Sequence, residues 1–187
     1  MKVILIRHGK TQGNIEKRYI GTTDEPLSQI GIEEIKKHQY PKCDLLFASP
    51  LLRCLETAKV IYPEKKPTVV ADLREMDFGD FENKNYKELK DNPAYQKWLD
   101  SNGEIAFPNG ELPADFKNRC VKSFMEIMNG INSEESVAFV VHGGTIMAIM
   151  SQLMDNPADY YSYQVENGNG YSCNWEKDLL KNPKKLF

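Results

Sequence analysis

The sequence contains little cysteine, no marked excess of charge of one sign and no long apolar run. Its four cysteines lie far apart and form no CxxC pair, which is typical of reduced thiols in a cytosolic protein. The formal net charge of −3 gives no reason to expect a nucleic acid or an anionic membrane as partner. The apolar start ends at Arg7, which is too short for a membrane span or a secretory leader. We therefore expect a cytoplasmic protein without a nucleic-acid or membrane partner.

The chain does contain a regular alternation of short apolar segments with amphipathic ones. Strands are predicted at residues 3–6, 44–48, 68–71 and 136–141, and helices at residues 28–38, 51–61, 86–101, 113–128 and 145–154. Such alternation is typical of an α/β fold with a doubly wound, mostly parallel sheet flanked by helices. The 187 residues suit a single domain, residues 1–187.

Three segments depart from this alternation. Residues 72–83 show no periodicity and are interpreted as an irregular loop. The helix over residues 86–101 is expected to be interrupted at Asn92-Pro93. Near the end of the chain, strands at about residues 161–166 and 171–175 are predicted to form a hairpin around the sequence Asn-Gly-Asn-Gly.

The polar residues Arg7 and His8 directly follow the first predicted strand. Ligands of open α/β sheets bind beyond the carboxyl ends of the strands, so these side chains lie where a ligand is expected. Gly9 and Gly13 allow the backbone to turn and to approach a ligand closely. The planar donors of arginine suit phosphate or carboxylate, which favours an anion. These residues alone are equally compatible with a strand end that carries a solvated arginine and an incidental histidine.

Two further strand ends carry polar residues of the same kind. Ser49 is predicted as a helix N-cap with Pro50 as the first helical residue, and Arg53 lies in the first turn of that helix. His142 and Gly143 follow the most apolar strand and also precede a helix. Because parallel strands end at one edge of a sheet, these groups are expected to converge there. Two arginines, two histidines and two helix N-termini predict a site for a dianionic phosphoryl group.

The same arrangement suggests the chemistry of His8. Neighbouring cations disfavour a second positive charge, so we expect a neutral imidazole with a free ring nitrogen. Such a nitrogen is a nucleophile toward a bound phosphate and can form a covalent intermediate. Glu75, in the loop after the third strand, is the candidate acid that protonates the leaving alkoxide.

Four short motifs follow one another along the chain. They are Arg7-His8-Gly9-Lys10-Thr11 with Asn14, Ser49-Pro50-Leu51-Leu52-Arg53 with Glu56-Thr57-Ala58, Leu73-Arg74-Glu75 with Phe78-Gly79, and Val141-His142-Gly143-Gly144. Any one of them occurs by chance, whereas the four in this order resemble the histidine phosphatase superfamily, which includes the cofactor-dependent phosphoglycerate mutases. The resemblance implies a phosphoglycerate mutase-like fold, with a small helical subdomain over the site formed by an insertion at about residues 76–118.

The resemblance also implies an activity and its residues. The protein would be a phosphatase of the histidine acid type that needs neither a metal ion nor a cofactor. His8 would be the phosphohistidine nucleophile and Glu75 the proton donor. The phosphoryl oxygens would be held by Arg7, Asn14, Arg53 and His142 and by the backbone N–H of Gly143. The third histidine, His38, lies in a polar run that is typical of a surface helix.

Within the superfamily, the sequence is similar to the alpha-ribazole phosphatase (adenosylcobalamin phosphatase) group. The similarity lies in residues 21–28, 76–82 and 107–111. It implies hydrolysis of a small phosphate ester, alpha-ribazole 5′-phosphate, in cobalamin biosynthesis. One alternative is a broad-specificity sugar-phosphate or phosphoglycerate phosphatase or mutase, and another is a non-catalytic phosphate-binding or interaction module. The chain is compact, without the longer insertions that mutases place over the site, which favours water as the final acceptor.

Three aromatic residues bear on the substrate. Tyr86, Tyr95 and Trp98 have side chains that can stack on a base or pack the helical segment onto the core. Packing is favoured for Trp98, and both interpretations stay open for the two tyrosines.

Overall fold

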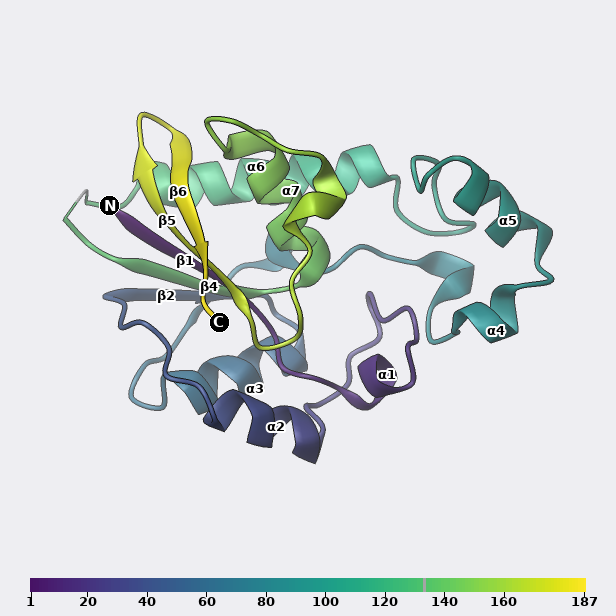
Figure 1. Ribbon diagram of the computed structural model, residues 1–187, viewed down its shortest axis with the longest axis horizontal. Helices are drawn as coiled ribbons and strands as arrows, with labels where there is room; N and C mark the ends of the chain where they lie inside the picture. Colours follow the sequence, from purple (N-terminus) through teal and green to yellow (C-terminus); the bar gives the residue numbers. More distant parts are fainter. Residues whose placement is uncertain (133) are drawn as a thin grey trace.

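The computed structural model describes residues 1–132 and 134–187, which form a mixed sheet with helices on both faces (Figure 1). In the described residues the sheet has six strands in the order β3-β2-β4-β1-β5-β6. The strands are β1 (Lys2–Arg7), β2 (Leu45–Ala48), β3 (Thr68–Val69), β4 (Val137–Val141), β5 (Gly170–Glu176) and β6 (Leu179–Lys185). The first four in sequence run parallel, and β5 and β6 are antiparallel additions at one side.

Strand β1 lies inside the sheet and is fully buried from Val3 to Ile6. It pairs in parallel with β4, from Val3 opposite Val137 to Arg7 opposite Val141. Successive side chains of a strand point to opposite faces, and here each face has its own apolar cluster. The continuous apolar run is explained by this burial on both faces.

Two pairs of helices cover these two faces (Figure 1). Helices α6 (Pro113–Asn129) and α7 (Gly143–Leu153) cover one face, and α2 (Gln29–Lys36) and α3 (Leu52–Ile61) cover the other. The prediction of a doubly wound, mostly parallel sheet flanked by helices is therefore confirmed. No helix within residues 1–132 and 134–187 is long and apolar enough to cross a membrane.

Short elements gather beyond the carboxyl ends of the parallel strands, where α4 and α5 lie at one end of the molecule (Figure 1). They are α1 (Gln12–Ile15), the 3₁₀ turns η1 (Ala71–Leu73), η2 (Gly79–Phe81) and η3 (Tyr160–Tyr163), and the helices α4 (Tyr86–Leu89) and α5 (Pro93–Asp100). The expected interruption at Asn92-Pro93 separates α4 from α5, with Asn92 capping α5. A third apolar cluster, including Phe81 and Phe107, joins this end to α6. The assignment of residues 76–118 as an insertion in one domain stays a prediction.

The predicted hairpin is wrong in its first strand. Residues 160–163 form the 3₁₀ turn η3, and the partner of β5 is β6. The Asn-Gly-Asn-Gly sequence instead forms a loop that leads into β5 at Gly170. The loop is bound to the end of β1, because Gly168 N–H donates to Arg7 O (3.1 Å) and Arg7 N–H to Asn169 O (2.9 Å). Strand β6 is polar and contains Pro183, which strands accommodate chiefly at the edge of a sheet. The sequence of β6 therefore gives no clear strand signal.

Helix α3 begins later than predicted. Leu51, not Ser49, is at the N-cap position, and Pro50 precedes the helix. The Ser49 hydroxyl lies 2.6 Å from Nε2 of His142 and is therefore committed to another contact. Asp24 caps the helix from a distant loop, because its Oδ1 accepts from the Leu52 N–H at 2.7 Å. Such a cap between distant segments carries no local sequence signal.

Candidate active site

The predicted convergence of three strand ends is present in the structure. Strands β2, β4 and β1 are neighbours that run in the same direction. The residues after them bring Arg7 and His8, Arg53, and His142 to one edge, and the rings of His8 and His142 lie 5.2 Å apart. Glu75 joins them from the loop after η1, where its Oε2 accepts from the backbone of α7.

His8 is only 4% exposed, and one of its ring nitrogens is already engaged. Nδ1 lies 2.7 Å from the carbonyl oxygen of Gly9, which can only accept a hydrogen bond. The hydrogen bond therefore assigns the proton to Nδ1 and leaves the lone pair on Nε2. Burial lowers the pKa of His8 well below its usual value, and the charges of Arg53 and Arg7 lower it further. The ring is neutral at physiological pH.

Each of the two guanidinium groups beside His8 has a buried N–H donor without a partner in the described part of the chain. Arg53 is fully buried and donates to the carbonyls of Thr23 and Gly21, both at 2.8 Å. Arg7 donates through Nη1 to the carbonyl of Val165 at 2.7 Å. The buried Nε atoms of both arginines lack a partner within the described residues. Because buried donors are normally satisfied, these two N–H groups indicate a site for an acceptor, and their charge favours an anion.

His142 is fully buried beneath the same site. Its Nε2 lies 2.6 Å from the Ser49 hydroxyl and 3.5 Å from the Cys54 sulfur. Burial, followed by the charge of Arg53, lowers the pKa of His142 well below its usual value. Gly143 opens helix α7 directly after it, and the first N–H groups of a helix have no partner within the helix. This helix end adds donors and a partial positive charge to the anion site.

Glu75 is buried with 9% of its surface exposed. Its Oε1 accepts from the N–H of Met76 (3.0 Å) and its Oε2 from the N–H of Gly144 (3.1 Å). Burial raises the pKa of Glu75, against the opposing effect of these hydrogen bonds and of Arg53 and Arg7. A carboxyl group with a raised pKa is suited to carry a proton in catalysis.

Asn14 is held in one orientation at the edge of the site. Its Oδ1 accepts from the N–H of Thr11 (3.2 Å) and from Nδ2 of Asn167 (3.0 Å), which leaves its own NH₂ group free of both contacts. The sequence did not reveal Asn167, because Asn-Gly was interpreted as a turn signal. Thr57 belongs to the second sequence motif, but no role was predicted for it; its hydroxyl accepts from the N–H of Gly9 at 3.0 Å.

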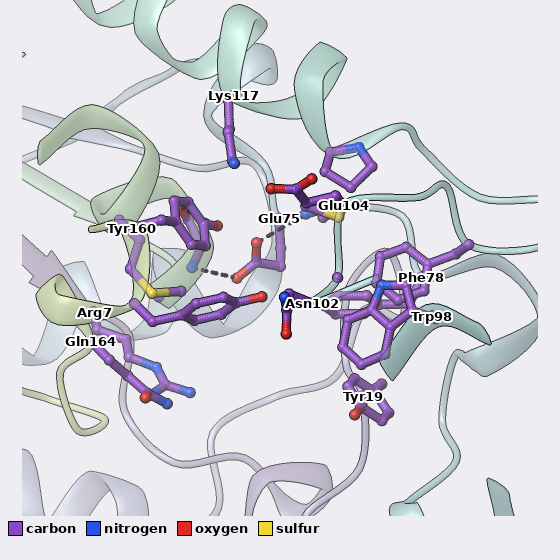
Figure 2. A pocket seen from close by; sticks show the side chains of 18 of the residues that line it. Arg7, Tyr19, Glu75, Phe78, Trp98, Asn102, Glu104, Lys117, Tyr160 and Gln164 are labelled. Carbon is purple, nitrogen blue, oxygen red and sulfur yellow. Dashed lines mark hydrogen bonds between the residues drawn. The ribbon is translucent and has the colours of Figure 1, made fainter. Parts of the chain in front are cut away.

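A cavity of about 950 Å³ opens above this site. Arg7, Asn14, Glu75 and Gly143 line one end, and His8, Arg53 and His142 are not among its lining residues. Figure 2 shows Tyr19, Phe78 and Trp98 together on one side of the cavity, opposite Arg7 and Gln164, with Glu75 between them. The volume is within the range of pockets for drug-sized ligands.

The three aromatic residues considered from the sequence have different positions. Trp98 lines the cavity and also packs against Phe107, with ring centroids 5.1 Å apart. Tyr86 lines the cavity and is 54% exposed. Tyr95 is a core residue, 6% exposed, whose hydroxyl lies 2.9 Å from that of Tyr19.

The fold defines an α/β protein, and the buried cations at its strand ends form a site that suits an anion. Residues 3–181 match the histidine phosphatase superfamily (branch 1), and the chain belongs to this family. The resemblance found in the four sequence motifs is thereby confirmed, as is the expectation that the protein is a phosphatase.

Individual relatives agree with this family. The chain is 29% identical to the adenosylcobalamin/alpha-ribazole phosphatase of Escherichia coli over 177 residues, which are 90% of this chain and 87% of that protein. The crystal structure of a putative alpha-ribazole-5′-P phosphatase from E. coli superposes with a TM-score of 0.87 at 25% identity, covering 100% of this chain and 95% of that one. Phosphoglycerate mutase from Thermus thermophilus superposes with a TM-score of 0.73 at 25% identity, covering 98% of both chains.

Proposed function

We propose that the protein hydrolyses a phosphate monoester through a phosphohistidine on His8. The observation that carries this proposal is the pair of buried, unpartnered Nε donors of Arg7 and Arg53 beside a neutral imidazole with a fixed tautomer. A phosphoryl group bound there would offer acceptor oxygens for these donors. His142, the Gly143 N–H and the Asn14 amide are the further groups proposed to hold its oxygens.

In the first step, Nε2 of His8 attacks phosphorus and the bond from phosphorus to the ester oxygen breaks. The leaving oxygen takes the electron pair of that bond and receives the proton of Glu75. Burial raises the pKa of Glu75, and an approaching dianion raises it further, so both effects favour the protonated carboxyl group that this step requires.

In the second step, a water molecule attacks the phosphorus of phosphohistidine from the side that the alcohol has vacated. The Glu75 carboxylate takes one proton of this water, the bond between phosphorus and Nε2 breaks, and inorganic phosphate leaves. His8 returns to its neutral form and Glu75 to its protonated form, so one catalytic cycle consumes one water molecule and no cofactor.

We propose alpha-ribazole 5′-phosphate as the substrate. The size of the cavity and its aromatic side, formed by Tyr19, Phe78 and Trp98, favour an alcohol that carries a flat ring system. The name of the E. coli relative supports the same choice. A cytoplasmic location and the absence of nucleic-acid partners stay predictions from the sequence.

A phosphoglycerate or sugar-phosphate substrate is the second candidate. Lys117 lines the cavity with its Nζ 4.5 Å from the ring centroid of Tyr160, and an ammonium group there suits a ligand with a carboxylate. The similarity in fold to a phosphoglycerate mutase supports it.

The deciding experiment measures phosphate release from alpha-ribazole 5′-phosphate, nucleoside monophosphates, hexose phosphates and 3-phosphoglycerate, with His8→Asn as the control. A preference in kcat/KM for the ribazole ester, lost in the control, supports the proposal. Equal rates on all esters contradict the substrate and retain the mechanism. Conversion of 3-phosphoglycerate to 2-phosphoglycerate in place of phosphate release identifies a mutase, and no turnover by a folded protein contradicts the enzymatic function.

A further inference from the structure

We infer that Arg119 is a positioning residue that fixes the general acid, acting on the backbone of the segment that carries Glu75. This inference rests on the proposed role of Glu75 as proton donor. Arg119 lies on helix α6 and is not among the residues that line the cavity. Its contribution is therefore made through Glu75 and not through the substrate.

All five N–H donors of the Arg119 guanidinium have an acceptor. Nε and Nη2 form a bidentate pair with Glu111, at 2.6 Å to Oε1 and 2.8 Å to Oε2. The remaining donors bind three backbone carbonyls around the general acid: Nη1 binds those of Asp72 (2.8 Å) and Arg74 (2.9 Å), and Nη2 binds that of Glu75 (3.0 Å).

Glu111 extends the same network beyond Glu75. Its backbone N–H donates to the carbonyl of Asp77 at 3.0 Å, and its Oε2 accepts from the N–H of Asp77 at 3.4 Å. The Arg119–Glu111 pair therefore holds the backbone on both sides of the general acid. Both side chains are shielded, with 14% and 15% of their surface exposed. Shielding strengthens the hydrogen bonds of the pair relative to those of an exposed salt bridge.

The position of the Glu75 carboxyl depends on this backbone. The carboxyl group fits between the N–H groups of Met76 and Gly144, and a Cβ atom at Gly144 would collide with Oε1. A small shift of the main chain at Glu75 therefore moves the proton donor relative to α7 and to the phosphoryl site. Misplacement by about 1 Å can reduce a catalytic rate by roughly 100-fold.

The chemistry requires arginine and not merely a positive charge. A lysine at position 119 retains its charge beside Glu111, but three rotatable donors on a single nitrogen cannot reach a carboxylate and three carbonyls that surround a planar fork. We therefore expect Arg119→Lys to behave like Arg119→Gln in the proton-transfer step.

The test compares two esters that differ in their need for an acid. Alcohols leave an alkyl phosphate only with a proton, whereas p-nitrophenolate leaves without one. We would measure kcat/KM for p-nitrophenyl phosphate and for the most active alkyl ester in wild type, Arg119→Gln, Arg119→Lys and Glu75→Gln. Arg74→Gln is the matched control, because it removes a charge from the same segment at a side chain that is 42% exposed. For each variant, the ratio of kcat/KM for the alkyl ester to kcat/KM for p-nitrophenyl phosphate is independent of the fraction of protein that is folded.

We expect both Arg119 variants to lose roughly 10- to 100-fold on the alkyl ester and less than about threefold on p-nitrophenyl phosphate, with the control unchanged. An unchanged ratio in the Arg119 variants overturns the inference, whether both rates fall together or neither falls. If Glu75→Gln changes the ratio and the Arg119 variants do not, the inference about Arg119 fails and the proposed role of Glu75 is retained. If Glu75→Gln also leaves the ratio unchanged, the proposed role of Glu75 fails.

Discussion

The two sides of the cavity are built in different ways. At the strand ends, His8, Arg53 and His142 are at most 4% exposed and are bonded to the backbone or to other side chains. On the other side, short helices and loops supply aromatic rings, and Tyr86 there is 54% exposed. The buried side fixes charges and protonation states, whereas the aromatic side offers mainly shape and contact area. This difference suggests that chemistry resides at the sheet edge and substrate selection on the aromatic side of the cavity.

Burial is the physical origin of the contrast. It lowers the pKa of His8, which keeps the imidazole neutral, and it raises the pKa of Glu75, which favours the protonated carboxyl group. The rings of Phe78 and Trp98 on the aromatic side carry no group that titrates near neutral pH. Variants on the two sides should therefore differ in kind, with effects on the rate of chemistry on one side and on the choice of ester on the other.

The largest effect should come from His8→Asn. Loss of the nucleophile is expected to reduce kcat by roughly 10⁴- to 10⁶-fold on every ester, because no other group can form the intermediate. Labelled substrate should leave an acid-labile, alkali-stable phosphoryl group on the wild type and none on the variant. His38→Asn, at an exposed histidine, is the matched control and should retain both the wild-type kcat and the phosphoryl labelling. Labelling of His8→Asn to the wild-type level would assign the nucleophile elsewhere.

Glu75→Gln should have the next largest effect. The amide keeps the size of the side chain but has no proton to give, so alkyl esters should lose roughly 10²- to 10⁴-fold in kcat/KM. In the wild type, kcat/KM for an alkyl ester should fall as the pH rises through the raised pKa of Glu75, because the acid loses its proton. This alkaline fall should be absent in the variant. Its persistence in Glu75→Gln would show that another group supplies the proton.

A smaller and more selective effect is expected from Trp98→Leu on the aromatic side. Stacking of an aromatic side chain on a base contributes about 1–3 kcal/mol, so kcat/KM for alpha-ribazole 5′-phosphate should fall about tenfold or more. The rate on 3-phosphoglycerate should stay unchanged, which separates selection from chemistry. Tyr86→Leu, at the exposed edge of the same cavity, is the control for aromatic area. A uniform loss on both esters would mean that Trp98 only stabilises the fold.

Most of the strand-end side could be predicted from the sequence, since it follows from local patterns. A buried apolar run ending in Arg7-His8, and another ending in His142, identify both the strand and the position of the site. The contacts that complete it come from distant segments and have no such pattern. Asn167 binds Asn14 across 153 positions in the chain, and Arg119 reaches Glu75 across 44.

The errors in the fold predicted from the sequence also arise from contacts between distant segments or from a missing local signal. Ser49-Pro50 has the local chemistry of a helix start, but the hydroxyl binds His142 and the helix begins at Leu52. The polar strand β6 turns back from β5 through Lys177 and Asp178, which both have positive φ (52° and 61°). Aspartate tolerates a positive φ, but Lys-Asp lacks the glycine or asparagine pairing that marks such a turn in a sequence. Tertiary contacts override the local signal in the first case, and the signal is absent in the second.

The smallest effect concerns stability, and it should again separate the two sides. The folded-state pKa of His8 and of His142 is lowered, so the unfolded chain binds more protons below about pH 6.5. The contribution of the two histidines to the free energy of unfolding is complete above that pH. It is lost as the pH falls, by up to about 1.4 kcal/mol per pH unit for each histidine. The raised pKa of Glu75 acts in the opposite direction. In urea unfolding between pH 7.5 and 5.5, the free energy of unfolding of His8→Asn should depend less steeply on pH than that of the wild type, by the contribution of one histidine. Trp98→Leu should lower the free energy of unfolding by the same amount at each pH. Equal slopes in His8→Asn and the wild type would mean that folding does not hold His8 neutral, and the contrast between the two sides would lose its electrostatic basis.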